Sequence, residues 1–164
     1  MYYHTLSGAM LTWDEPMDAA LQAFWETIVA AWRAKADYAT VSRRVTSAEN
    51  PLLAPTGGLI TPPVWAHPVF QALMDLAYRL GIAQGALGTD GTEDLQDPFT
   101  DTWLPVSEAA IVKGVTVPGL HKAIQRGDVA ARPQTPGQHR LEVSQRSLAH
   151  WTPDRMRQAA RKQS

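Results

Sequence analysis

The clearest periodic pattern of apolar positions lies between residues 14 and 35. Apolar side chains recur there at steps of three and four residues, which predicts the buried stripe of an amphipathic helix; they are Met17, Leu21, Phe24, Trp25, Ile28 and Trp32. Asp14 is expected to cap this helix, with Pro16 in its first turn. Trp25 and Trp32 lie seven residues apart on one face, so they belong either to the core or to a dimer seam.

Weaker patterns continue through the first half of the chain. Residues 38–45 form a second helical stretch, whereas 47–66 contain prolines and turn dipeptides that predict an ordered, apolar loop. After Pro68 helical spacing returns at Phe70, Leu73, Ala77 and Leu80. Gly81 or Gly85 is expected to end that helix.

An acidic, polar stretch separates the two halves. Residues 88–102 carry five carboxylates and almost no apolar side chain, which indicates a linker. Four of the carboxylates are crowded together in a way that could hold a metal ion, at Asp90, Glu93, Asp94 and Asp97. Their spacing does not match a calcium-binding loop, so no metal or other cofactor is predicted.

The last third of the chain predicts two short helices joined by a tight turn. Ser107 is expected to cap the first helix and Gly114 to end it in a left-handed conformation. Thr116 caps the second helix, and the buried stripe of that helix is Leu120, Ala123 and Ile124. Two short helices with a glycine-containing turn are typical of a helix-turn-helix, whose second helix enters the major groove of DNA.

Polar side chains that suit DNA face away from this stripe. We expect the second helix to contact DNA through Thr116, His121, Lys122, Gln125 and Arg126. Glutamine side chains pair with adenine, and arginine or lysine side chains pair with guanine or phosphate.

The residues that follow predict a hairpin wing. Residues 129–131 and 141–143 can pair around a turn at 134–138, with Leu148 and Trp151 in the core beyond it. The wing is expected to touch the DNA backbone through Arg132, Gln138, His139 and Arg140. A basic tail then carries Arg155, Arg157, Arg161 and Lys162, which either adds electrostatic affinity for DNA or is a solvated terminus.

The net charge of the chain changes sign between residues 102 and 103. Residues 103–164 hold ten Lys or Arg against four Asp or Glu, a net charge of +6, whereas residues 1–102 hold five against twelve, a net charge of −7. This asymmetry predicts a basic module that meets a polyanion and an acidic module with another role.

The basic module also resembles a known family. It contains V-S-E-A-A, then G-V-T-x-x-x-L-x-x-A-I-x-x-G-D-V-x-A, then H-R-L-x-V and S-L-x-x-W, a run similar to the excisionase/MerR-like winged helix-turn-helix proteins. The resemblance covers residues 103–152 and implies a bacterial or phage DNA-binding protein. The hairpin tip is longer and richer in proline than is usual in that family. Gly119 either lets the backbone approach a phosphate or is a neutral substitution that costs about 1 kcal/mol of helix propensity.

The patterns together predict a mainly α fold. Its parts are a helical, Trp-rich domain for dimerisation or partner binding at 1–87, the linker at 88–102, a winged helix-turn-helix with a β-hairpin wing at 103–152, and a basic helix or tail at 153–164. The predicted function is that of a homodimeric transcriptional regulator that binds specific sequences of duplex DNA. Two alternatives remain open: an excisionase-like factor that bends DNA, and an antitoxin-type protein whose N-terminal half binds a protein partner.

Other classes are disfavoured by composition and motifs. The chain has no cysteine, which excludes disulfides and Cys-based metal sites, and it lacks the common nucleotide-binding, hydrolase and zinc-protease motifs, so no enzyme is predicted. Residues 51–74 are almost uncharged, but five prolines argue against a membrane span. The first ten residues do not resemble a secretory signal, so we expect a cytoplasmic protein associated with the bacterial nucleoid.

Overall fold

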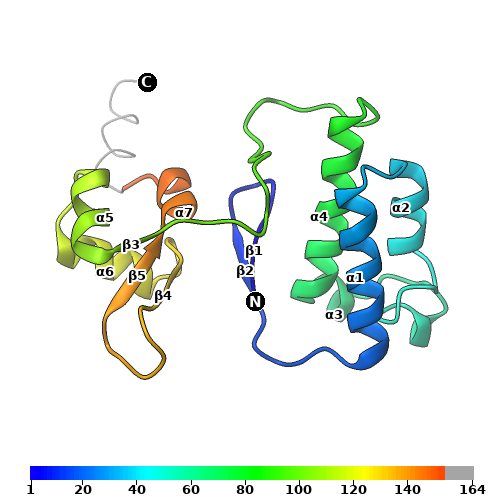
Figure 1. Ribbon diagram of the computed structural model, residues 1–164, viewed down its shortest axis with the longest axis horizontal. Coiled ribbons are helices and arrows are strands. Elements are labelled where there is room, and N and C mark those ends of the chain that lie inside the picture. The colour runs from blue at the N-terminus through cyan, green and yellow to red at the C-terminus, as the bar shows by residue number, and fades with distance from the viewer. Residues whose placement is uncertain (154–164) are drawn as a thin grey trace. The chain divides into compact units, whose positions relative to one another are not determined.

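A computed structural model of the chain describes residues 1–153 (Figure 1). The chain divides into two compact units, the first unit at 1–98 and the second unit from residue 99 onward. The first unit contains the strands β1 (Tyr2–His4) and β2 (Met10–Thr12), the helices α1 (Ala19–Arg33), α2 (Tyr38–Val45), α3 (Pro62–Trp65) and α4 (Pro68–Ala83), and a 3-10 turn at Ala54–Thr56. In the second unit lie the strands β3 (Trp103–Pro105), β4 (Ala131–Pro133) and β5 (Leu141–Ser144) and the helices α5 (Val106–Lys113), α6 (Val117–Gln125) and α7 (Gln145–His150).

Local signals account for most helix boundaries of the first unit. α2 has the predicted bounds, but α1 begins later than predicted because Asp18, not Asp14, caps it by accepting the Leu21 N–H at 2.8 Å. α4 passes through Gly81 and ends before Gly85, whose φ is +70°. Gly81 is required for packing instead, since an added Cβ would lie 2.6 Å from Leu87 Cδ1.

The core of the first unit lies where α4 packs against α1 and α2 (Figure 1). Trp25 is buried there, and its ring meets those of Tyr3 and Trp13 edge-on, with centroids 6.2 and 5.4 Å apart. Trp25 therefore belongs to the core rather than to a dimer seam. Trp32, one heptad further on, is only half-buried.

A buried ion pair fastens the N-terminal hairpin to α4. Asp75 accepts hydrogen bonds from Tyr3 Oη, from the Leu6 N–H and from Arg79 Nε, each at 2.7 Å. The Arg79 guanidinium also donates to the carbonyl oxygens of His4 at 2.9 Å and Gln96 at 2.8 Å. One carboxylate and one guanidinium thus connect β1, α4 and a segment that follows α4.

That segment belongs to the predicted linker at 88–102. The Asp94 N–H donates to Leu6 O at 2.8 Å and the His4 N–H donates to Pro98 O at 2.9 Å. Residues 94–98 are therefore fixed to the hairpin of the first unit. Within residues 1–153, no three His, Cys, Asp or Glu side chains gather in a way that could hold a metal ion.

The second unit combines its helices with a three-stranded antiparallel sheet in the order β3-β5-β4. Leu104 of β3 lies opposite Val143 of β5, and Arg132 of β4 lies opposite Glu142 of β5. The predicted hairpin is present with shifted bounds, but β3 is an additional strand. Because β3 leads directly into α5, that helix begins at Val106 after Pro105 and is not capped by Ser107 as predicted.

The predicted mainly α fold class is wrong. The described chain is mixed α/β, with helices in both units and a small antiparallel sheet in each. The N-terminal hairpin turns at Gly8, whose φ of +79° favours glycine, and its two strands were not predicted. None of the helices in the described part of the chain has both the length and the hydropathy needed to cross a membrane.

Candidate nucleic-acid interface

The turn between α5 and α6 is set by two residues that the sequence singled out. Gly114 ends α5 in the left-handed region, with a φ of +65°, as predicted. The Thr116 hydroxyl caps α6 by accepting the Gly119 N–H at 3.2 Å. A Cβ at residue 119 would lie 3.0 Å from that hydroxyl oxygen, so a larger residue there would require a small shift of the cap.

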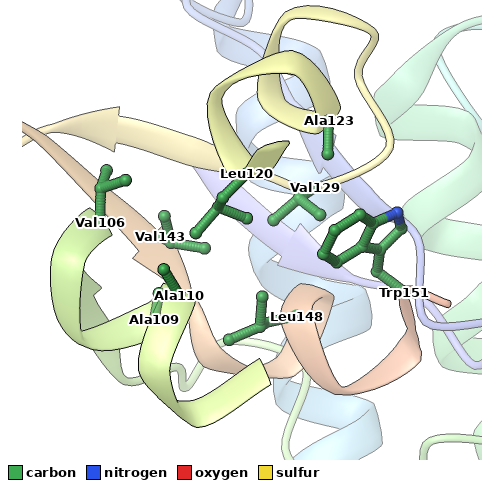
Figure 2. Close-up of a cluster of buried hydrophobic side chains, with 9 residues drawn as sticks. All are labelled: Val106, Ala109, Ala110, Leu120, Ala123, Val129, Val143, Leu148 and Trp151. Carbon is green, nitrogen blue, oxygen red and sulfur yellow. The ribbon is translucent and has the colours of Figure 1, made fainter. Parts of the chain in front are cut away.

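A compact apolar cluster fixes which face of α6 points outward. Its buried members come from α5, α6, α7 and β5, from the loop after α6 and from the residue after α7 (Figure 2): Val106, Ala109, Ala110, Leu120, Ala123, Val129, Val143, Leu148 and Trp151. Leu120 and Ala123 contribute the buried face of α6, which confirms the predicted stripe, and Ile124 packs at its edge. The orientation of α6 is therefore determined by core packing.

The opposite face of α6 carries exposed polar side chains in two rows. His121 and Gln125 lie one turn apart in the first row, and Lys122 and Arg126 lie one turn apart in the second. All four are exposed. The structure thus brings together the side chains that the sequence predicted for the recognition helix.

Most of the basic side chains that the structure describes in this unit are already engaged within the protein. Arg126 forms an ion pair with Asp128 at 2.8 Å, Lys113 donates to Ala149 O at 3.2 Å, and the buried Arg146 donates to Thr100 O at 2.7 Å. Among the described residues of this unit, Lys122 and Arg140 are the basic side chains for which no such interaction exists.

Arg132, predicted to grip the DNA backbone, is held on the sheet. Its Nε and Nη2 both donate to Glu142 Oε2 at 3.2 Å, and its guanidinium carbon lies 4.2 Å from the centre of the Trp103 ring. The side chain therefore joins all three strands of the sheet. Lys122 and Arg140 are better placed than Arg132 to meet an external anion.

The loop between β4 and β5 carries the remaining predicted contacts. Gln138, His139 and Arg140 are exposed there. The Gln134 N–H donates to Arg140 O at 2.8 Å and closes the base of the loop, while Gly137 turns its tip with a φ of +84°. The predicted tail contacts at Arg155, Arg157, Arg161 and Lys162 lie outside the described residues.

A hollow of about 240 Å³ lies beside the second row of α6 and was not predicted. It is lined by Val115, Thr116, Gly119, Lys122, Arg126, Trp151 and Pro153. Trp151 is only 7% exposed, and its indole Nε1 has no hydrogen-bond partner in the structure. In Figure 2 the indole nitrogen lies on the side of the ring away from Val129. The sequence assigned Trp151 to the core and gave no signal that its N–H would remain unsatisfied.

Comparisons with protein-family models, with curated proteins and with solved structures find no match to this chain. The resemblance of residues 103–152 to the excisionase/MerR-like proteins therefore stays a prediction from the motif run.

Proposed function

We propose that the protein is a sequence-specific binder of duplex DNA and acts as a transcriptional regulator of bacterial or phage type. The observation that carries this proposal is the outer face of α6, where His121, Lys122 and Gln125 are exposed while Leu120 and Ala123 fix the helix in the core. Such a helix presents base-reading and phosphate-binding groups in a fixed geometry. The motif run of the second unit supports the same interpretation.

The dimensions of α6 suit the major groove. An α-helix with its side chains is about 10–12 Å across, and the major groove of B-DNA is about 12 Å wide, so α6 can lie along it with its nine residues. With α6 in the groove, the row of His121 and Gln125 faces base edges. Arg140 in the β4–β5 loop supplies a cation for the adjacent backbone.

Selection from a randomised duplex pool tests the proposal. The wild-type protein should enrich a defined sequence motif, and its affinity should fall as salt rises. Gln125→Ala should relax the preference at one position of the motif, because one bidentate contact to a base discriminates by about 1–3 kcal/mol. Lys122→Ala should weaken binding to every sequence alike.

Arg43→Ala is the matched control, since it removes an exposed positive charge from the first unit. It should bind like the wild type. A selection that enriches no motif, together with no binding of duplex DNA even at low salt, would exclude a DNA-binding function.

We further propose that the first unit forms a homodimer or binds a protein partner through an apolar surface on α3 and α4. Trp65 is 55% exposed and Tyr78 is 39% exposed, and both line a hollow of about 190 Å³ together with Phe70 and Met74. Exposed apolar groups that adjoin a hollow are typical of contact surfaces. Dimerisation would double the DNA contacts and impose a half-site spacing.

Sedimentation of the wild type and of Trp65→Ala tests the homodimer. The wild type should sediment as a dimer at micromolar concentration, and the variant should shift toward the monomer. A wild type that stays monomeric at all concentrations excludes self-association and leaves only the heterologous partner, as an antitoxin would have.

A further inference from the structure

The hollow beside α6 combines features that point to an anionic ligand. The first turn of α6, with Thr116 and Gly119, forms one side of it, and Lys122 and Arg126 line it further along the helix. The N-terminal end of a helix carries a partial positive charge, which adds to the charges of the two side chains. Asp128 pairs with Arg126 at 2.8 Å and neutralises part of this charge, so Lys122 is the principal free cation of the hollow.

The unsatisfied indole N–H of Trp151 is an independent indication that a hydrogen-bond acceptor binds in the hollow. Buried N–H groups are paired in the great majority of cases, and an unpaired one is unfavourable by about 1–3 kcal/mol. Trp151 Nε1 can only donate, so its missing partner must be an acceptor. An acceptor that enters the hollow beside Lys122 is favoured further if it carries negative charge.

The position of the hollow relative to the base-facing row indicates the source of that acceptor. Lys122 and Arg126 lie next to His121 and Gln125 around the helix, and a helix in the major groove is flanked by the two phosphate backbones. The row beside the base-facing row therefore meets a backbone. The volume of about 240 Å³ is below the roughly 300–1,000 Å³ of sites for drug-sized ligands, which fits a single group of a larger molecule.

We propose that this hollow binds one phosphate group of the DNA backbone, with Trp151 Nε1 as hydrogen-bond donor and Lys122 as counter-charge. The inference rests on the proposed DNA-binding function and adds an anchoring contact outside the bases. Because the indole nitrogen is buried in the free protein, the phosphate reaches it only when the side chains that cover it move. The contact fixes the register of α6 without reading sequence.

The indole N–H signal of Trp151 reports directly on this contact. The chain has six tryptophans, so the ¹H–¹⁵N spectrum of the full-length protein contains six indole signals, and Trp151→Phe identifies the one in question. Two titrations are made at low salt, one with a mixed-sequence duplex and one with inorganic phosphate. The duplex should move the Trp151 proton downfield and slow its exchange with solvent.

Affinity measurements separate this contact from the proposed function. Trp151→Phe keeps an aromatic side chain but removes the indole N–H donor together with the five-membered ring, and it should weaken duplex binding about tenfold or more, because hydrogen bonds to charged groups are among the stronger ones. Trp13→Phe, at a half-buried tryptophan of the first unit that lies outside the proposed contact surface, is the matched control and should bind like the wild type. A thermal melt of each variant checks that it is folded.

Three outcomes test the phosphate site and the DNA-binding function separately. If the duplex binds but the indole signal stays still and Trp151→Phe binds like the wild type, the phosphate site is wrong and the DNA-binding function stands. If inorganic phosphate moves the signal and the duplex does not, the site takes free phosphate and its assignment to the DNA backbone is overturned. If the wild type binds no duplex, the proposed function itself fails, and the anchoring contact fails with it.

Discussion

Neutralising Asp75 should destabilise the first unit more than any other single change of charge that the structure identifies. The Asp75 carboxylate accepts three hydrogen bonds at 2.7 Å, from Tyr3 Oη, the Leu6 N–H and Arg79 Nε. Asp75→Asn preserves the size of the side chain but removes the charge and turns one acceptor into a donor. Arg79, which is 5% exposed, then keeps its charge in the interior without a counter-ion.

The expected magnitude follows from this burial. Removing one partner of a buried ion pair costs about 3–5 kcal/mol, since the other charge stays buried and unpaired. That loss is large against the roughly 5–15 kcal/mol by which a domain is stable. Arg44→Gln is the control, because Arg44 and Glu49 form a comparable pair at 3.1 Å that is exposed to solvent. Exposed pairs contribute about 1 kcal/mol or less.

Urea unfolding at neutral pH measures both changes. The free energy of unfolding should fall by about 3–5 kcal/mol in Asp75→Asn and by less than about 1 kcal/mol in Arg44→Gln. A double-mutant cycle with Arg79→Gln should show strong coupling between Asp75 and Arg79. If Asp75→Asn lowers the free energy of unfolding by less than about 1 kcal/mol, this ion pair does not hold the N-terminal hairpin on α4.

Three further changes test other parts of the packing. Burial and the nearby Asp75 carboxylate raise the pKa of Tyr3 above its usual value of 10.0. The protonated Tyr3 side chain therefore contributes its full stability below pH 10, and this contribution is lost as the pH rises further. The stability difference between the wild type and Tyr3→Phe, measured by urea unfolding, should therefore shrink above that pH. Gly81→Ala should lower the melting temperature despite the better helix propensity of alanine, because its Cβ would lie 2.6 Å from Leu87 Cδ1, and Leu87→Ala in the same chain should recover part of the loss. Thr116→Ala removes the cap of α6 and should cost about 1 kcal/mol in the same unfolding assay, with Thr116→Ser retaining the stability.

Elements that depend on local signals could be predicted from the sequence, and those that depend on distant partners could not. The bounds of α2 and the stripe of α6 follow from nearby caps and apolar spacing. The N-terminal hairpin has strands of only three residues, and it is fastened by Asp75 and Arg79 far along the chain. No pattern within the first twelve residues reveals that support. The strand β3 was missed for the same reason, since it exists only through its pairing with β5.

The candidate site shows the same division. The spacing of apolar residues correctly predicted that His121, Lys122 and Gln125 would be exposed. The sequence could not show that Arg132 is held by Glu142 and Trp103, because that depends on the register of a hairpin and on an unpredicted strand. The unpaired indole of Trp151 is likewise a property of packing in three dimensions.

Most of the described cations of the second unit already interact with groups of the protein. Its net charge therefore overstates the number of phosphate groups that it can contact. A net charge of +6 suggests many phosphate contacts, but Lys122 and Arg140 are the described basic side chains of the second unit that remain available without breaking an interaction. Each phosphate contact contributes about 0.9 to the slope of log K against log salt. A variant that ends at Pro153 should therefore show a slope of about −2, and Lys122→Ala in that variant should reduce it to about −1. The full-length chain, which adds four basic residues at 155, 157, 161 and 162, should show a steeper slope. An equally steep slope in the shortened variant would mean that Arg126 and Arg132 leave their carboxylate partners to contact DNA.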